Sequence, residues 1–303
     1  MSSLDEASVR ELAIALVTNE RYIEKDWHLV RALAIIASIN VPGVKPAFSG
    51  GTSLSSAWRL IHRFSEDIDF KVTLEGPSKK DMDESRRAYR QEIVKRLIEA
   101  GFVLDGDPVI GNGSRFFRVA FHYGPKFPDA GGVRPSLQVE ITFTGTALEP
   151  KLQPVQSLLG RALKQAPDVS LLPCVDPIET AADKVSALAW RTATRRRGTE
   201  GDDPAVVRHL HDLAALAAKV AAEPVFKPLV LDILEKDAKR SKKEGVTGRA
   251  LLAAMLPTIA ADDLWRREYE QFVSAVSFGK DEDRISYDQA MAACARLVTV
   301  ILG

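Results

Sequence analysis

The chain has 303 residues, 46% of them hydrophobic and 27% charged, and its formal net charge at pH 7 is zero. This composition is that of an ordinary globular protein, and the length predicts about two domains. A neutral total argues against wholesale non-specific binding of polyanions and leaves room for local basic patches.

The first part of the chain alternates helical and extended patterns. Apolar residues at three- and four-residue steps predict two helices between Ser8 and Ile39, and Asn40 to Gly43 breaks the pattern. Val44 to Ser49 then reads as a short strand that runs into the pair Gly50-Gly51. Helical spacing returns from Thr52 to His62.

A strand bearing two aspartates follows, from Asp67 to Leu74. A charged amphipathic helix from Lys80 to Ala100 comes next, and Phe102 to Leu104 begins another strand. Two runs that alternate apolar and polar residues, Arg115 to Tyr123 and Ser136 to Phe143, are separated by a segment rich in Gly and Pro. They predict a hairpin with a long loop.

The pattern changes after Pro150. Apart from a proline-rich connection between Pro167 and Pro177, segments rich in Ala and Leu predict helices at 179–197, 204–222, 228–242, 248–257, 262–277 and 286–302. We therefore predict an α+β fold in which residues 1–150 form a small mixed sheet with flanking helices. Residues 151–303 are expected to form an all-helical bundle.

The cysteines and the N-terminal sequence indicate the cell compartment. Cys174 and Cys294 lie far apart and near no CxxC or His pattern, which predicts neither a disulfide framework nor a zinc site. No basic-then-apolar leader is present, and no apolar run approaches the roughly 20 residues of a membrane span. We expect a soluble cytoplasmic protein with no membrane partner.

Asp67 and Asp69 are the strongest candidates for a metal site. Side chains two apart on a strand point to one face, so both carboxylates look the same way while Ile68 and Phe70 look into a core. Such a pair can hold Mg²⁺, which needs a few hard oxygen ligands and completes its shell with water and substrate phosphates. A solvated acidic strand is the alternative, but aspartate is a poor strand former.

Two further features would complete such a site. Gly50-Gly51 ahead of a helix places backbone N–H groups and the positive end of a helix dipole at one spot, which suits a phosphate, although a plain tight turn would also need glycines. Glu140 is the candidate third carboxylate, if a neighbouring strand brings it beside Asp67 and Asp69; otherwise it is a surface glutamate. Two metal ions on three carboxylates would activate an attacking hydroxyl and neutralise a leaving pyrophosphate.

The motifs carry a family resemblance. Gly-Gly-Thr-Ser-Leu from Gly50, a short helix, and Arg63-Phe-Ser-Glu-Asp-Ile-Asp-Phe70 are followed by Lys184 and Arg191 in a KxxAxxxR pattern and by Arg208-His-Leu-His-Asp-Leu213. This order resembles the AbiEii/AbiGii-type, MenT-like nucleotidyltransferase toxins of the polymerase-β-like superfamily. It implies a nucleotidyltransferase-like core whose active-site cleft is completed by the helical domain.

The resemblance also implies roles for individual residues. Asp67 and Asp69 would be the metal ligands. The residues expected to bind the nucleotide phosphates are Gly50, Gly51 and Ser53, and Lys184 would contact the triphosphate. Asp212 would complete the catalytic set. His209 stands where the family often has an acidic residue, so this chain departs from the family pattern there.

Arg191, Arg195, Arg196 and Arg197 form a dense positive cluster at the end of the Lys184 helix. A helix dipole favours cations at this end, which would explain them structurally. Clustered arginines also suit contact with an RNA backbone.

The implied activity is Mg²⁺-dependent transfer of a nucleoside monophosphate from an NTP, with release of pyrophosphate, to the 3′ end of tRNA. The chain would then be the toxin of a toxin–antitoxin system, of the type that acts in abortive infection, with a cognate antitoxin protein or transcriptional regulator as its partner. The residues themselves leave open a protein or an antibiotic-type small molecule as acceptor. A non-catalytic binding module that retains the fold also remains open.

Overall fold

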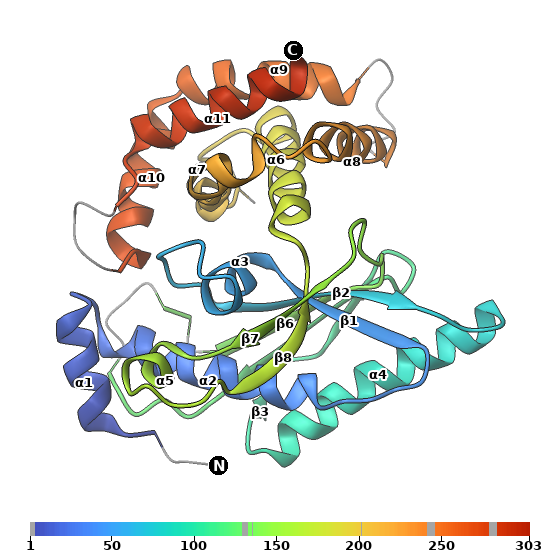
Figure 1. The fold of residues 1–303 in the computed structure, drawn as a ribbon, viewed down its shortest axis with the longest axis vertical. Coiled ribbons are helices and arrows are strands. Elements are labelled where there is room, and N and C mark those ends of the chain that lie inside the picture. Colours follow the sequence, from blue (N-terminus) through green and yellow to red (C-terminus); the bar gives the residue numbers. More distant parts are fainter. Residues whose placement is uncertain (1–3, 129–132, 135, 201, 241–245, 279–283) are drawn as a thin grey trace. The chain divides into compact units, whose positions relative to one another are not determined.

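The computed structural model describes residues 4–128, 133–134, 136–200, 202–240, 246–278 and 284–303. The chain divides into two compact units, Met1–Val175 and Asp176–Gly303 (Figure 1). Each unit buries its own set of apolar side chains.

The first unit is built on a mixed β-sheet. Its strands are β1 Val44–Ser49, β2 Asp67–Leu74, β3 Val103–Leu104, β4 Val109–Gly111, β5 Phe116–His122, β6 Ser136–Thr142, β7 Lys151–Val155 and β8 Val169–Cys174. They lie in the order β3-β5-β6-β2-β1-β8-β7, with β4 paired to β5. The central strand β2 runs antiparallel to β1 and parallel to β6.

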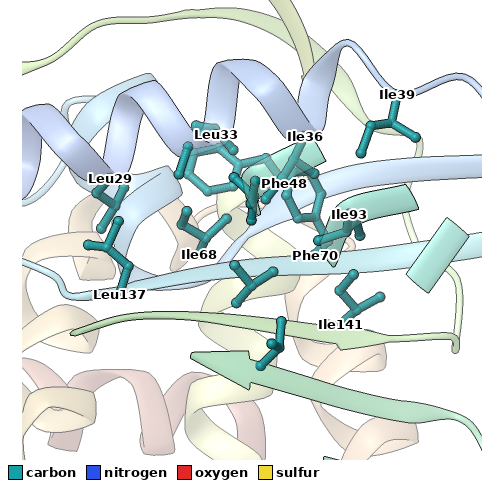
Figure 2. Packing of buried hydrophobic residues seen from close by; sticks show 14 of the residues in the cluster. Leu29, Leu33, Ile36, Ile39, Phe48, Ile68, Phe70, Ile93, Leu137 and Ile141 are labelled. Carbon is teal, nitrogen blue, oxygen red and sulfur yellow. The ribbon is translucent and has the colours of Figure 1, made fainter. Parts of the chain in front are cut away.

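Helices cover one face of this sheet. The first unit contains α1 Glu6–Ala15, α2 Glu20–Ala37, α3 Gly50–Thr52, the π-helical turn η1 Ser53–Ala57, α4 Lys79–Glu99 and α5 Leu158–Ala162. Leu33 of α2 and Ile93 of α4 pack with Phe48 and Phe70 of the sheet in one buried cluster (Figure 2). Burying each such side chain contributes about 1.5–3 kcal/mol, so this face holds the sheet and helices together. Because side chains alternate, the polar residues of the same strands lie on the opposite face.

Much of this unit agrees with the sequence-based predictions. The α+β fold class, the strands at 44–49 and 67–74 and the two N-terminal helices are confirmed. So is the hairpin, since β5 and β6 pair antiparallel. Part of its predicted loop, residues 129–132, lies outside the described residues.

Residues 151–175 differ from the prediction. We expected them to open the helical half, but they contribute β7, α5 and β8, so the first unit ends at Val175 rather than at residue 150. The prolines between Pro167 and Pro177 made the β8 segment read as a connection, and β7 contains a proline, Pro154. Proline is tolerated on edge strands, and β7 is the last strand of the sheet order.

The second unit is helical. Its elements are α6 Pro177–Thr194, the 3₁₀ turn η2 Pro204–Val206, α7 Val207–Val220, α8 Phe226–Arg240, α9 Gly248–Ala260, α10 Asp263–Val276 and α11 Tyr287–Leu302. Asp176 caps α6 by accepting the Ile178 N–H at 2.9 Å, and Pro177 fits the first turn. The predicted helices are confirmed, although residues 241–242 of the one expected at 228–242 lie outside the described part. Within the described residues, none of the helices has the length and apolarity that crossing a membrane requires.

Candidate active site

The glycine pair is shaped by side chains of the aspartate segment. Gly50 has a φ of +74°, and a Cβ atom there would overlap Oδ2 of Asp69. A Cβ atom on Gly51 would lie 2.8 Å from Nη2 of Arg63 and 2.9 Å from Oγ of Ser65. The glycine motif and the RxSxD motif therefore belong together physically, because side chains of the second fill the space that the first leaves open.

The helix after the glycines is shorter than predicted. Helix α3 has three residues and continues as the π-helical turn η1, rather than as a regular helix over 52–62. Its dipole is correspondingly small, so any binding of phosphate rests on the local backbone N–H groups. Ser53 is buried at 1% exposure, and its Oγ has no hydrogen-bond partner among the residues that the structure describes. The hydroxyl that we expected on the phosphates thus lies in the interior.

Asp67 and Asp69 lie on the sheet face opposite the buried cluster that α2 and α4 share with the sheet. Both are partly buried, whereas the alternate residues Ile68 and Phe70 are in the core. In the parallel pairing of β2 and β6, Asp69 stands directly beside Glu140. Neighbouring strands are about 4.8 Å apart, so this register places Glu140 on the strand next to Asp69, as the sequence analysis required for a third carboxylate.

The carboxylates fit a magnesium ion as a pair rather than as a closed cluster. Among the residues that the structure describes, no three His, Cys, Asp or Glu side chains are gathered closely enough to hold a metal ion. Oε1 of Glu140 instead accepts a hydrogen bond from Nε2 of Gln138 at 2.8 Å. Two aspartates suffice for Mg²⁺, which uses one or two carboxylates and keeps waters and substrate phosphates as its other ligands. The two aspartates therefore offer the hard oxygen donors that suit this ion.

A charged network that sequence reasoning missed surrounds Asp67. Nη2 of Arg134 donates to Oδ1 of Asp67 at 2.6 Å, and the Lys25 ammonium forms an ion pair with Glu66. Burial lowers the pKa of Lys25, while Glu66 opposes that shift. Burial also opposes the charge on Arg134, yet the Asp67 and Glu66 carboxylates together raise its pKa. The carboxylates thus outweigh burial at Arg134, whereas burial outweighs Glu66 at Lys25.

In the second unit, the two predicted catalytic residues form a buried ion pair. Lys184 projects from α6 and Asp212 from α7, with Nζ and Oδ2 2.8 Å apart. Their side chains are 9% and 0% exposed. Nδ1 of His211 lies 3.3 Å from the other oxygen of Asp212. Asp212 thus fixes the position of the Lys184 ammonium.

His209 has a definite partner in this unit. Nη1 of Arg191 lies 3.0 Å from Nε2 of His209, and also contacts Asp203 at 3.4 Å. Burial, together with the nearby charges of Lys184, Arg208 and Arg191, lowers the pKa of His209 well below its ordinary value. A neutral imidazole accepts a hydrogen bond from Arg191 through Nε2, where an acidic residue would form an ion pair.

Comparison with protein families identifies the chain. Residues 31–293 match the family described as nucleotidyl transferase AbiEii toxin, type IV TA system. The chain belongs to this family. The AbiEii-family assignment makes the protein a nucleotidyltransferase toxin, and it implies an NTP substrate and a cognate antitoxin.

A solved structure supports the fold. The AbiEii-family chain matches MenT4, a nucleotidyltransferase toxin from Mycobacterium tuberculosis H37Rv, with a TM-score of 0.51, 19% identity and 99% coverage of both chains. A cytoplasmic RNA terminal U-transferase also matches, with a TM-score of 0.26, 14% identity, and coverage of 70% of this chain and 51% of that one. For CdnC of E. coli MS115-1 with ATP, the TM-score is 0.30, the identity 13%, and the coverage 89% and 97%. The last two TM-scores are too low to carry an argument, and no curated protein matches.

The arginines of the predicted cluster in this AbiEii-family toxin differ in burial. The Arg197 side chain is 5% exposed, pairs with Asp202 at 2.9 Å and with Glu268, and lies 4.5 Å from the Trp265 ring centroid. These contacts place Arg197 in the interior of the second unit rather than on an RNA-binding surface. Arg195 and Arg196 are exposed.

The glycine turn gives a first testable prediction for the AbiEii-family toxin. We expect Gly50→Ala to lower nucleotidyl transfer at least about 100-fold, because the new methyl group displaces the Asp69 carboxylate and small misplacements cost that much. Gly106→Ala is the matched control, since Gly106 has a φ of +76° but a Cβ atom there would meet nothing within 4 Å. Both variants carry similar backbone strain, so kinetics and melting temperatures separate strain from displacement. Equal activity losses in the two would contradict the role of Gly50.

Proposed function

We propose that the protein is a Mg²⁺-dependent enzyme that transfers a nucleoside monophosphate from an NTP to an acceptor hydroxyl and releases pyrophosphate. The observation that carries the proposal is the pair Asp67 and Asp69 on one face of β2, with the Asp69 carboxylate seated against Gly50, in a chain of the AbiEii family. Bound Mg²⁺ would supply charge neutralisation at the phosphates and a lowered pKa for the attacking hydroxyl.

Several of the predicted site residues have a proposed role in this reaction. Asp67 and Asp69 hold the ion, and Glu140, in register with Asp69, is the adjacent carboxylate for a second ion. The backbone N–H groups of the Gly50-Gly51 turn orient the phosphates. We carry over from the family resemblance that Lys184 contacts the triphosphate. Asp212 would hold its ammonium in place.

We propose the 3′ end of tRNA as the acceptor. Two observations support it: the family is one of toxins in toxin–antitoxin systems, and Arg195 and Arg196 expose two guanidinium groups side by side in sequence. We place the reaction in the cytoplasm, where NTPs and tRNA are present. The cognate antitoxin, a protein or transcriptional regulator, would relieve the resulting growth arrest, as in abortive infection.

A labelling experiment tests the proposed function. Purified protein is incubated with each α-labelled NTP, Mg²⁺, and either total tRNA, protein extract or a set of small hydroxyl compounds. We expect label on tRNA, lost when the tRNA 3′ hydroxyl is oxidised beforehand. Label found only on protein or on a small molecule would show that tRNA is not the acceptor. Absence of transfer in every arm would contradict the enzyme assignment.

A second experiment tests the exposed arginines. We expect Arg195→Ala/Arg196→Ala to weaken tRNA binding and to reduce its salt-dependence slope by about 1.4–1.8, since each lost phosphate contact removes about 0.7–0.9. NTP binding should stay unchanged. Lys236→Ala/Lys239→Ala is the control, because these exposed lysines already pair with Asp232 and Glu235. An unaltered salt slope in the arginine variant would exclude these residues from the RNA surface.

A further inference from the structure

Arg134 forms an ion pair with Asp67, one of the two predicted metal ligands. Its guanidinium donates to Oδ1 of Asp67 at 2.6 Å, and its Nε is 3.5 Å from Oε2 of Glu66. The side chain is 46% exposed and pairs with Asp67 on the polar face of β2. Gln138, whose Oε1 lies 3.5 Å from Nη1, stands in register with Asp67 on β6.

The main chain of Arg134 is held by a buried ion pair. Its N–H donates to Oε2 of Glu66 at 3.0 Å, and its carbonyl oxygen accepts from Nζ of Lys25 at 2.8 Å. Lys25 is only 2% exposed and is itself paired with Glu66. Burying an ammonium is costly, so a lysine placed here implies that the position of this segment matters. Both backbone polar groups of Arg134 are thus fixed, while its long, half-exposed side chain ends at Asp67.

We propose that Arg134 is a nucleotide-binding residue that exchanges Asp67 for a phosphate of the incoming NTP; this inference rests on the proposed function. Before the nucleotide binds, the guanidinium neutralises Asp67. When Asp67 binds the metal ion, Arg134 loses that partner and takes phosphate oxygens instead. No bond is made or broken, since one charge-assisted hydrogen-bond set replaces another.

The chemistry of the site favours this assignment. An NTP brings several negative charges to a face that already carries Asp67, Asp69 and Glu140, so cations from the chain are needed beside the metal. A guanidinium offers a planar fork of donors that matches phosphate oxygens in pairs. A half-exposed ion pair adds little to folding stability, so the pairing with Asp67 is not explained by stability.

The exchange predicts effects of opposite sign on two ligands. In Arg134→Ala we expect the dissociation constant of a fluorescent NTP, measured with Ca²⁺ to prevent turnover, to rise about 10–100-fold, as loss of charge-assisted hydrogen bonds implies. The same variant should bind Mn²⁺ alone more tightly by electron paramagnetic resonance, because a cation competing for Asp67 has gone. Arg134→Lys should lie between Arg134→Ala and wild type for both ligands, since it keeps the charge without the fork.

Controls separate this inference from its alternatives. Arg87→Ala, at an exposed arginine on α4 of the opposite, helix-covered face, should change neither constant. If Arg134 were merely structural, both ligands would bind more weakly, and melting temperatures would fall in the Ala and Lys variants. If it only blocked the metal, Mn²⁺ affinity would rise and NTP affinity would not fall. Either result overturns the assignment, whereas failure of the wild-type protein to bind any NTP would overturn the proposed function together with it.

Discussion

Asp69→Asn is expected to abolish nucleotidyl transfer, lowering kcat at least about 1000-fold, while the melting temperature stays the same or rises slightly. A metal ion supplies several kcal/mol of charge stabilisation in the transition state, and a neutral amide is a poor ligand for Mg²⁺. Asparagine keeps the size of the side chain, so the space left by Gly50 remains filled. Removing one negative charge beside Glu140 also relieves repulsion in the metal-free protein. The measurements are single-turnover transfer and thermal unfolding of the same samples.

Asp107→Asn is the matched control, because Asp107 is an exposed aspartate of the same unit and should tolerate the change in both assays. Mn²⁺ binding to Asp69→Asn gives a readout that does not depend on turnover, and it should be weakened. Wild-type transfer by Asp69→Asn would remove this carboxylate from the metal site and with it the main support for the proposed function.

The parts of the site that could be predicted are those whose geometry is set by local sequence. Strand alternation alone placed Asp67 and Asp69 on one face, and the same rule on a second strand put Glu140 on a polar face. The pairing that places Glu140 beside Asp69 joins segments far apart in the sequence. It still puts both carboxylates on the polar face, because each strand has one apolar face that must be buried.

The parts that could not be predicted depend on contacts between distant segments. Arg134 reaches Asp67 across 67 residues, and no periodicity links the two. Arg197 read as part of a surface cluster because a linear run of arginines does not show which one turns inward to Trp265. Ser53 was expected on the nucleotide phosphates, but in the π-helical turn at 53–57 its side chain is buried.

Lys184→Met is expected to destabilise the second unit by about 3–5 kcal/mol and to abolish transfer. The substitution keeps the length of the side chain but leaves the fully buried Asp212 carboxylate without its ammonium contact, and breaking one side of a buried ion pair costs this much. Urea unfolding followed by circular dichroism measures the loss. Lys219→Met, at an exposed lysine on α7, is the control and should change stability by less than about 0.5 kcal/mol.

The double variant Lys184→Met/Asp212→Leu separates stability from catalysis. Replacing both charges by apolar groups of similar volume is often neutral, so we expect most of the lost stability to return. Transfer should stay absent, because the ammonium proposed to contact the triphosphate is still missing. A double variant that regained both stability and transfer would show that the pair only holds α6 to α7. A double variant that regained stability but not transfer would show that the reaction needs an ammonium group at this position.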